Sequence, residues 1–396
     1  MRQAPAIQSN TEAFDGWIRS GFVELNTALE ELYFRQENRA TVSGIGDEIK
    51  ARLVEEGQRY IHALLEEGNT DEGFDAGFDL LGNVGLFMGA CRRHELAELS
   101  DAVRQALKET SALALQLGAS LGVAPRFATS HLTTHNRAVR GSYRMFTSLE
   151  AEAVFLEYNT RAILAYKRAA DAIVRVLPMG VSHPVACDLL ETATQALGDV
   201  IRNNAALFEA LDIDRFFYCV RPYYKPYRVG LHEYRGANAG DFAGINEIDV
   251  LLGLCQPENL SYSQLLVEKF LFMMPEDQQR LRDCMRRRSL MDQLLDELER
   301  SKSEPWFQRA VAAFLTLCEA HGEAARQHHD QLVERFITHP SDSLPEENLT
   351  NITASGPPLH VMLSSLEKLR DLRSAADRDD IPSRYRDLLR LRAAVA

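Results

Sequence analysis

Apolar residues recur three and four positions apart over most of this chain, which is the spacing of one face of an α-helix. Proline- and glycine-bearing stretches interrupt the pattern, and we interpret them as the connections between helices. The pattern predicts helices over 15–36, 47–67, 74–93, 94–118, 149–177, 184–211, 262–272, 275–299, 306–337 and 359–372.

No convincing series of strands with alternating apolar and polar residues is present, so an all-α fold is expected. Two long segments between the predicted helices stand out. Residues 222–240 are rich in tyrosine and glycine, and residues 339–358 are polar. Long connections in compact domains are often functional, although both segments can also be plain surface loops. We expect an N-terminal helical extension over 1–70 and a catalytic helical domain over 71–396.

The composition is that of an ordinary globular protein, with 45% hydrophobic and 26% charged residues. The formal net charge of -13 argues against nucleic acid or an anionic membrane as the main partner, since both select basic surfaces. No apolar run approaches the roughly 18 residues of a membrane span, and the N-terminus lacks a signal core. A cytoplasmic protein is the expectation. The scattered cysteines form no CxxC pair, which argues against a zinc site or a disulfide framework.

One histidine draws attention on the predicted helix 306–337. His329 follows Ala325 by four positions and precedes Leu332 by three, so it lies on the apolar stripe and is expected to point inward. A buried imidazole needs a partner, because an unsatisfied buried polar group costs roughly 1–3 kcal/mol. A haem iron is one candidate partner and a hydrogen bond in the core is the other. Spacing alone does not decide between His329 and its neighbour His328.

Several collinear motifs resemble the haem-dependent indoleamine and tryptophan dioxygenase superfamily, and most closely its monodechloroaminopyrrolnitrin synthases. The run from Val220 to Gly230, with Arg221-Pro222-Tyr223-Tyr224 at its start, is similar to a run of the synthases. Further similar segments are Gly85 to His94, His131 to Asn136, Phe216-Phe217, Asn238-Ala239-Gly240, Asp249 to Gly253, His329 to Arg335 and Ser355-Gly356. These motifs extend from about Phe74 to Leu372 and do not cover the first seventy residues.

The resemblance implies a helical haem-binding domain of the indoleamine and tryptophan dioxygenase type with extra N-terminal helices. It implies haem b (iron protoporphyrin IX) as cofactor and His329 as the proximal iron ligand, with O2 or peroxide as co-substrate. Arg221 then matches the residue that pairs with the substrate carboxylate, since a guanidinium offers two parallel donors. The residues expected around the substrate ring and head group are Phe216, Phe217, Tyr223, Gly240 and Ser355.

Each of these assignments has a structural alternative. Arg221 can brace a loop, Phe216 and Phe217 can be plain core, and Ser355 can cap the last helix. His131 and His135 are weak candidates for a distal catalytic base, because such a histidine is not general in the superfamily.

Three departures from the family pattern concern the substrate more than the haem. The C-terminal loop reads Thr353-Ala354-Ser355-Gly356 where the dioxygenases have a glycine-rich sequence. Ile337 stands where the synthase has a tyrosine, and Asp241-Phe242 replaces a Gln-Ser pair of the indoleamine enzymes.

The sequence therefore predicts a haem-dependent oxygenase or oxidative rearrangement enzyme that acts on tryptophan or a related indole or aromatic amino acid in secondary metabolism. Two alternatives stay open: a haem-dependent hydroxylase of an aromatic amino acid, and a non-catalytic haem-binding sensor on the same scaffold. The expected partner is the small aromatic substrate, with neither nucleic acid nor membrane. A homodimer through the leading helices also stays open.

Overall fold

The computed structural model describes residues 9–68, 73–98, 100–237, 240–331 and 359–395. Within these residues the secondary structure is helical apart from one short hairpin, which confirms the all-α prediction. The chain divides into two compact units. Unit 1 comprises Met1–Leu156, Asp212–Asn238 and Ser343–Gly356, and unit 2 comprises Glu157–Leu211, Ala239–Asp342 and Pro357–Ala396.

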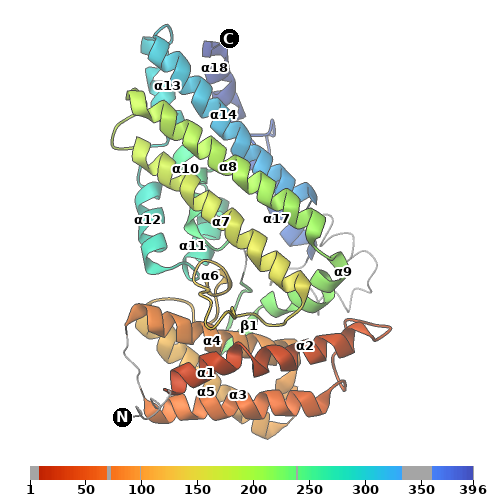
Figure 1. Cartoon of the computed structure of the whole chain (residues 1–396). Coiled ribbons are helices and arrows are strands. Elements are labelled where there is room, and N and C mark those ends of the chain that lie inside the picture. The colour runs from red at the N-terminus through yellow and green to blue at the C-terminus, as the bar shows by residue number, and fades with distance from the viewer. Residues whose placement is uncertain (1–8, 69–72, 99, 238–239, 332–358, 396) are drawn as a thin grey trace. The chain divides into compact units, whose positions relative to one another are not determined.

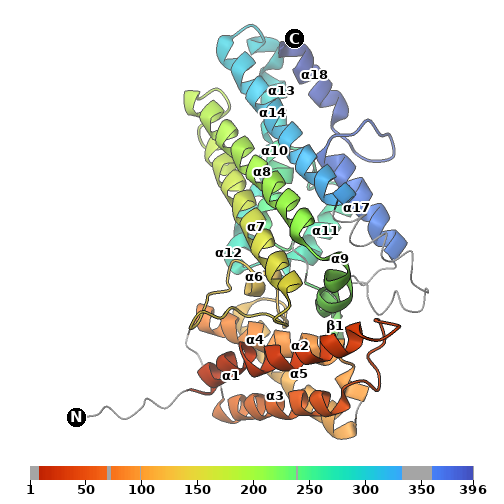
Figure 2. The ribbon, with the colours of Figure 1, turned by 45° about the vertical axis from the view of Figure 1, so that its right-hand side comes forward.

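Unit 1 is a layered group of helices around an aromatic core. In both views α2 follows α1 along one side of the unit and α3 runs alongside them, while α4 packs against α5 (Figures 1 and 2). Trp17 of α1 contacts Phe22 of α2 and Phe87 of α4, with ring centroids 5.5 and 6.0 Å away. The elements of unit 1 are α1 (Asn10–Ile18), α2 (Gly21–Phe34), α3 (Asp47–Glu67), α4 (Phe74–Arg93), η1 (Leu96–Glu98), α5 (Asp101–Leu121), α6 (Thr129–Leu132), α9 (Ile213–Arg215), η2 (Phe216–Val220), η3 (Arg221–Tyr224), β1 (Tyr227–Val229) and β2 (His232–Tyr234).

Unit 2 is a helical bundle in which α8 and α14 make the most extensive contact and run side by side along their lengths (Figures 1 and 2). The buried face of α8 carries small and branched residues at helical spacing: Ala186, Leu190, Ala193, Leu197 and Val200. The facing stripe of α14 includes Phe307, Phe314, Leu317 and Ala324. The elements are α7 (Glu150–Val176, whose first turns belong to unit 1), α8 (Pro184–Ala210), α10 (Ala243–Leu252), α11 (Leu260–Phe270), α12 (Pro275–Met285), α13 (Leu290–Ser301), α14 (Pro305–Gln327), α17 (Leu359–Arg373) and α18 (Tyr385–Val395).

Three of the predicted helices are wrong because each is two helices, and one of them, 94–118, divides into η1 and α5. The predicted helix 15–36 is interrupted between Ile18 and Gly21, and 275–299 is interrupted between Met285 and Leu290. At the second break Ser289 is the N-cap of α13, and its Oγ accepts a hydrogen bond from the amide of Asp292 at 3.1 Å. Such a cap ends the apolar periodicity locally without any proline or glycine.

The sequence pattern predicted an irregular connection after Pro222, but part of this segment forms a β-hairpin. Strands β1 and β2 pair antiparallel, with Tyr227 opposite Tyr234. Gly230 in the turn has φ +60°, a conformation that a residue with a Cβ rarely adopts. Strands of three residues are too short to leave a readable alternation in the sequence.

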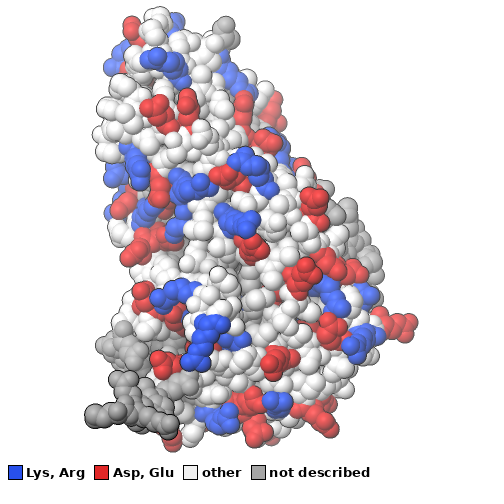
Figure 3. Space-filling model, in the orientation of Figure 1, with Lys and Arg blue, Asp and Glu red and all other residues white. Residues whose placement is uncertain are grey.

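The predicted extension over 1–70 stays a prediction. Helices α1, α2 and α3 belong to the same compact unit as α4 and α5, and α3 packs directly on α5. In the described part of the chain no helix is both long and apolar enough to cross a membrane. On the face drawn in Figure 3, acidic and basic side chains are interspersed over the surface.

Candidate functional site

The predicted substrate segment of unit 1 folds into two tight helical turns. Phe216–Val220 forms a π-helical turn, and Arg221–Tyr224 continues as a 3-10 turn with Pro222 near its start. The side chains of Phe216, Phe217, Arg221 and Tyr223 are all buried, at 6%, 0%, 5% and 1% exposure. Short π-helical turns within helices are frequent at functional sites, because the extra residue changes the direction of the following side chains.

Arg221 carries a buried guanidinium near an aromatic ring. Its Cζ atom lies 5.7 Å from the ring centroid of Phe217. Burial lowers the pKa of Arg221 to about 10, so the group is still a cation at neutral pH. A buried cation is attracted strongly to an anionic partner, because little water screens the interaction.

The aromatic residues around this segment divide into two groups. Phe216 packs against Phe155 with ring centroids 4.7 Å apart. Tyr223 stacks on Phe146 at 4.3 Å, and its hydroxyl lies 3.3 Å from Nε2 of His94. The polar end of Tyr223 therefore belongs to a buried hydrogen-bond network, while its ring contributes to the aromatic core.

That network was not predicted from the sequence. Arg93 donates two hydrogen bonds of 2.8 Å to the carboxylate of Glu30, and both side chains are buried. His94 lies beside this pair, with Nδ1 3.0 Å from the hydroxyl of Tyr33 and Nε2 2.8 Å from Oδ1 of Asn26. Burial lowers the pKa of His94 well below its usual value, so the imidazole is neutral. The network ties α2, α4 and η3 together.

The two distal-base candidates lie in unit 1 as well. Nδ1 of His131 accepts the amide of Ala128 at 2.8 Å, and its Nε2 lies 2.9 Å from the carbonyl of Phe78. Burial lowers the pKa of His131 to about 3. Both nitrogens thus serve the local backbone, as in a structural histidine. His135 is more accessible and packs edge-on against Phe78 at 5.0 Å, with Nε2 3.8 Å from Asp75.

The iron-ligand candidate lies in unit 2, in a π-helical turn over residues 328–331 that follows α14. The predicted inward orientation of His329 is confirmed, because the residue is only 8% exposed, whereas His328 is exposed. Nδ1 of His329 lies 3.2 Å from Oδ1 of Asp330 and 3.3 Å from the guanidinium of Arg370. Within the described ranges Nε2 of His329 has no hydrogen-bond partner.

A second buried network of unit 2 supports the helices near His329. Asp249 of α10 accepts hydrogen bonds from His321 of α14 at 2.7 Å, from Arg373 of α17 at 2.8 Å and from the hydroxyl of Tyr262 at 2.7 Å. Burial opposes ionisation of the Asp249 carboxyl, but the Arg373 guanidinium and the hydrogen bond with His321 hold its pKa well below the usual range. Gly240 contributes a carbonyl that accepts a hydrogen bond from Lys269 at 3.0 Å.

A family model described as monodechloroaminopyrrolnitrin synthase PrnB matches residues 8–395. This chain belongs to that family. It is therefore an enzyme, a haem-dependent oxidoreductase, and its family acts on a small tryptophan-derived substrate. The match also extends the relationship to the first seventy residues, which the sequence motifs did not reach.

The surroundings of His329 are compatible with an axial ligand of haem. An axial histidine donates the lone pair of one ring nitrogen while the other nitrogen carries a hydrogen held by an acceptor. Nδ1 of His329 faces the carboxylate of Asp330, although the Arg370 guanidinium also approaches it, and Nε2 is not engaged by the described residues. Ser355 and Ile337 lie outside the described residues, so their predicted roles stay predictions. Asp241 and Phe242, at the sequence departure, are buried just before α10.

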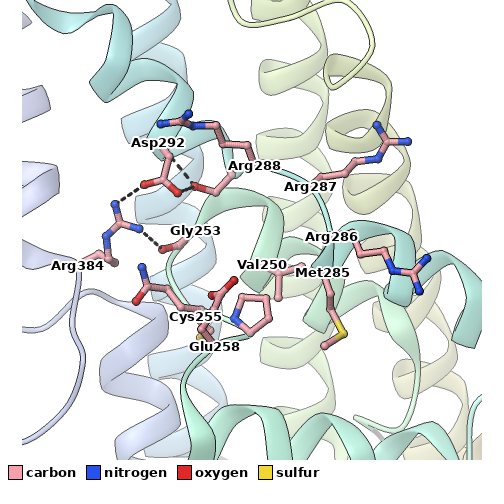
Figure 4. Close-up of a pocket in the computed structure, with 13 residues that line it drawn as sticks. Val250, Gly253, Cys255, Glu258, Met285, Arg286, Arg287, Arg288, Asp292 and Arg384 are labelled. Carbon is pink, nitrogen blue, oxygen red and sulfur yellow. Dashed lines mark hydrogen bonds and ion pairs between the residues drawn. The ribbon is translucent and has the colours of Figure 1, made fainter.

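One pocket of unit 2, of about 400 Å³, contains none of the predicted site residues (Figure 4). Arg384 lies at one side of it and pairs with Asp292 at 2.7 Å. The exposed side chains of Arg286 and Arg287 point away from that pair. Because Arg384 is already neutralised by Asp292 and Asp387, we assign the pocket no role in the reaction.

Proposed function

We propose that this protein is a haem b oxygenase or oxidative rearrangement enzyme that acts on tryptophan or a related indole or aromatic amino acid in secondary metabolism. The single observation that carries the proposal is the buried imidazole of His329, with Nε2 open, in a chain that belongs to the monodechloroaminopyrrolnitrin synthase family. Bound haem supplies the activation of O2 or peroxide, while the protein binds and orients the substrate.

Arg221 pairs with the carboxylate of the substrate. Its positive charge is buried, and the ring of Phe217 lies 5.7 Å from Cζ, so a charged group and an aromatic surface are close together in this segment. By resemblance to the family, Phe216, Phe217, Tyr223 and Gly240 are assigned to the ring of the substrate, and Ser355 to its head group. A fixed ring orientation limits which carbon atoms react, so the same residues determine which product forms.

The role of Arg221 is tested by comparing tryptophan with tryptamine, which lacks the carboxylate. Each ligand is titrated into the haem-loaded protein and followed by the change in the Soret band. Loss of a charge-assisted hydrogen-bond pair costs about 1.5–3 kcal/mol, so Arg221→Ala should weaken tryptophan binding roughly 10- to 100-fold. The same substitution should leave the weak binding of tryptamine nearly unchanged.

Arg228 provides the matched control, since it lies in β1 of the same segment and its side chain is exposed. Arg228→Ala should change neither affinity. If wild-type protein binds tryptophan and tryptamine equally, the assigned role of Arg221 is wrong. If no indole or aromatic amino acid perturbs the haem spectrum or is converted to a product of different mass, the proposed activity is wrong.

A further inference from the structure

The π-helical turn after α14 brings an acidic side chain next to the candidate iron ligand. Adjacent residues in a regular α-helix point in different directions, about 100° apart around the axis. In the turn over 328–331 the side chain of Asp330 nevertheless reaches His329, with Oδ1 3.2 Å from Nδ1. The contact directs one ring nitrogen of His329 to a carboxylate and leaves the other for a ligand.

A second group competes for the same nitrogen. Arg370, from the last turns of α17, places a guanidinium nitrogen 3.3 Å from Nδ1 of His329 and 3.7 Å from Oδ1 of Asp330. The guanidinium can only donate hydrogen bonds, and the carboxylate can only accept them. Nδ1 therefore has to carry a hydrogen to interact with Asp330, and has to lack one to interact with Arg370.

These two interactions select opposite tautomers of the neutral imidazole. With Nδ1 bonded to Asp330, the hydrogen is on Nδ1 and the lone pair of Nε2 is available to a metal. With Nδ1 bonded to Arg370, the hydrogen is on Nε2 and that nitrogen cannot ligate. The balance between Asp330 and Arg370 thus determines whether His329 is ready to bind iron.

We propose that Asp330 is the positioning residue of His329, that its carboxylate holds the imidazole as the Nδ1–H tautomer, and that Arg370 opposes it. This inference rests on the proposed ligation of haem iron by His329. An anionic acceptor also makes the ligating nitrogen a stronger donor, which stabilises the ferric over the ferrous state and lowers the reduction potential.

A purely structural role explains the arrangement less well. The side chain of Asp330 is 53% exposed, and ion pairs at such sites contribute little to stability. Asp330→Ala is therefore expected to leave the thermal unfolding midpoint of the apoprotein unchanged. Any effect on the iron then reports on the imidazole rather than on general loss of folding.

The test measures the Fe(III)/Fe(II) midpoint potential and the iron–imidazole stretching frequency of the haem-loaded protein. Asp330→Ala should raise the potential, lower the stretching frequency and accelerate haem loss to a haem-scavenging apoprotein. Arg370→Gln should shift all three in the opposite direction. Asp330→Asn keeps an acceptor oxygen without the charge, so its values should lie between those of wild type and Asp330→Ala.

The matched controls are Asp379→Asn and Arg386→Gln. These residues pair with each other at 3.9 Å in the same unit, and their side chains are 99% and 89% exposed. Neither control should shift the potential. If Asp330→Ala and Arg370→Gln shift the potential in the same direction, or not at all, while His329→Ala still abolishes the Soret band, the positioning role is wrong and the proposed ligation stands. If wild-type protein binds no haem, both proposals are wrong.

Discussion

The carboxylate of Asp249 lies 2.7 Å from Nε2 of His321, and both side chains are buried within unit 2. His321 is on α14, eight positions before His329, and the carboxylate also accepts hydrogen bonds from Arg373 of α17. One acidic residue on α10 therefore holds together the two helices whose ends carry His329 and Arg370. The candidate iron ligand thus lies about two helical turns from this network.

Replacing Asp249 by alanine should destabilise the protein strongly. The substitution leaves the buried Arg373 cation and the buried His321 imidazole without their acceptor. Removal of one partner of a buried ion pair costs about 3–5 kcal/mol. The free energy of unfolding of the apoprotein, measured in urea, should fall by that amount. Asp379→Ala, at an exposed position, should change it by less than about 0.5 kcal/mol. Equal values for the two variants would contradict the importance of the network.

Gly85→Ala should destabilise the protein, whereas Gly198→Ala should stabilise it. A Cβ atom at Gly85 of α4 would lie 2.1 Å from the backbone nitrogen of Phe127, so the backbone would have to move. Overpacking of this kind costs about 1–3 kcal/mol. At Gly198 of α8 the nearest atom to a Cβ is a guanidinium nitrogen of Arg202 at 3.4 Å, and alanine should stabilise the helix by about 0.5–1 kcal/mol. The midpoint of thermal unfolding should fall for Gly85→Ala and rise for Gly198→Ala.

The pH dependence of stability should change when Glu247 is replaced by glutamine. Burial raises the pKa of Glu247 to about 7, although its partner Arg280 opposes the shift. Between about pH 4.5 and 7 the folded protein keeps this proton while the unfolded chain has released it. Glu247 therefore makes the folded state progressively less stable as the pH rises through this window.

Glu247→Gln cannot titrate, so its stability relative to wild type should increase between pH 5 and pH 8, by on the order of 2 kcal/mol. Urea unfolding at the two pH values measures the difference. Glu299→Gln, at an exposed position of α13, should change the free energy of unfolding by the same small amount at pH 5 and at pH 8. A difference between Glu247→Gln and wild type that does not change with pH would contradict the assigned titration.

Much of the helical framework can be predicted from the spacing of apolar residues. The predicted bounds of α3 and α4 agree with the structure at both ends, because the flanking Gly46, Gly68 and Gly73 interrupt the pattern there. The short helix α10 was missed because nine of its ten residues are buried, so it has no polar face to reveal a period.

For the candidate site, too, the sequence predicts some features and not others. The inward orientation of His329 follows from the stripe of α14, and the burial of Phe216, Phe217 and Tyr223 follows from their apolar character. The pairing of Asp249 with His321 and Arg373 does not, because the partners are 72 and 124 positions away. A single sequence carries no signal for such a pair. The structure also buries His329 and exposes His328, a difference that the spacing of the apolar residues alone could not predict.

Ligation of haem iron by His329 underlies the whole proposed function. It is tested most directly by the absorption spectrum of the purified protein, expressed with a haem precursor, beside the His329→Ala and His328→Ala variants. We predict a strong Soret band that is retained in His328→Ala and is lost or shifted in His329→Ala. A wild-type protein without a Soret band after addition of haemin, or a band that is unaffected in His329→Ala, would contradict it.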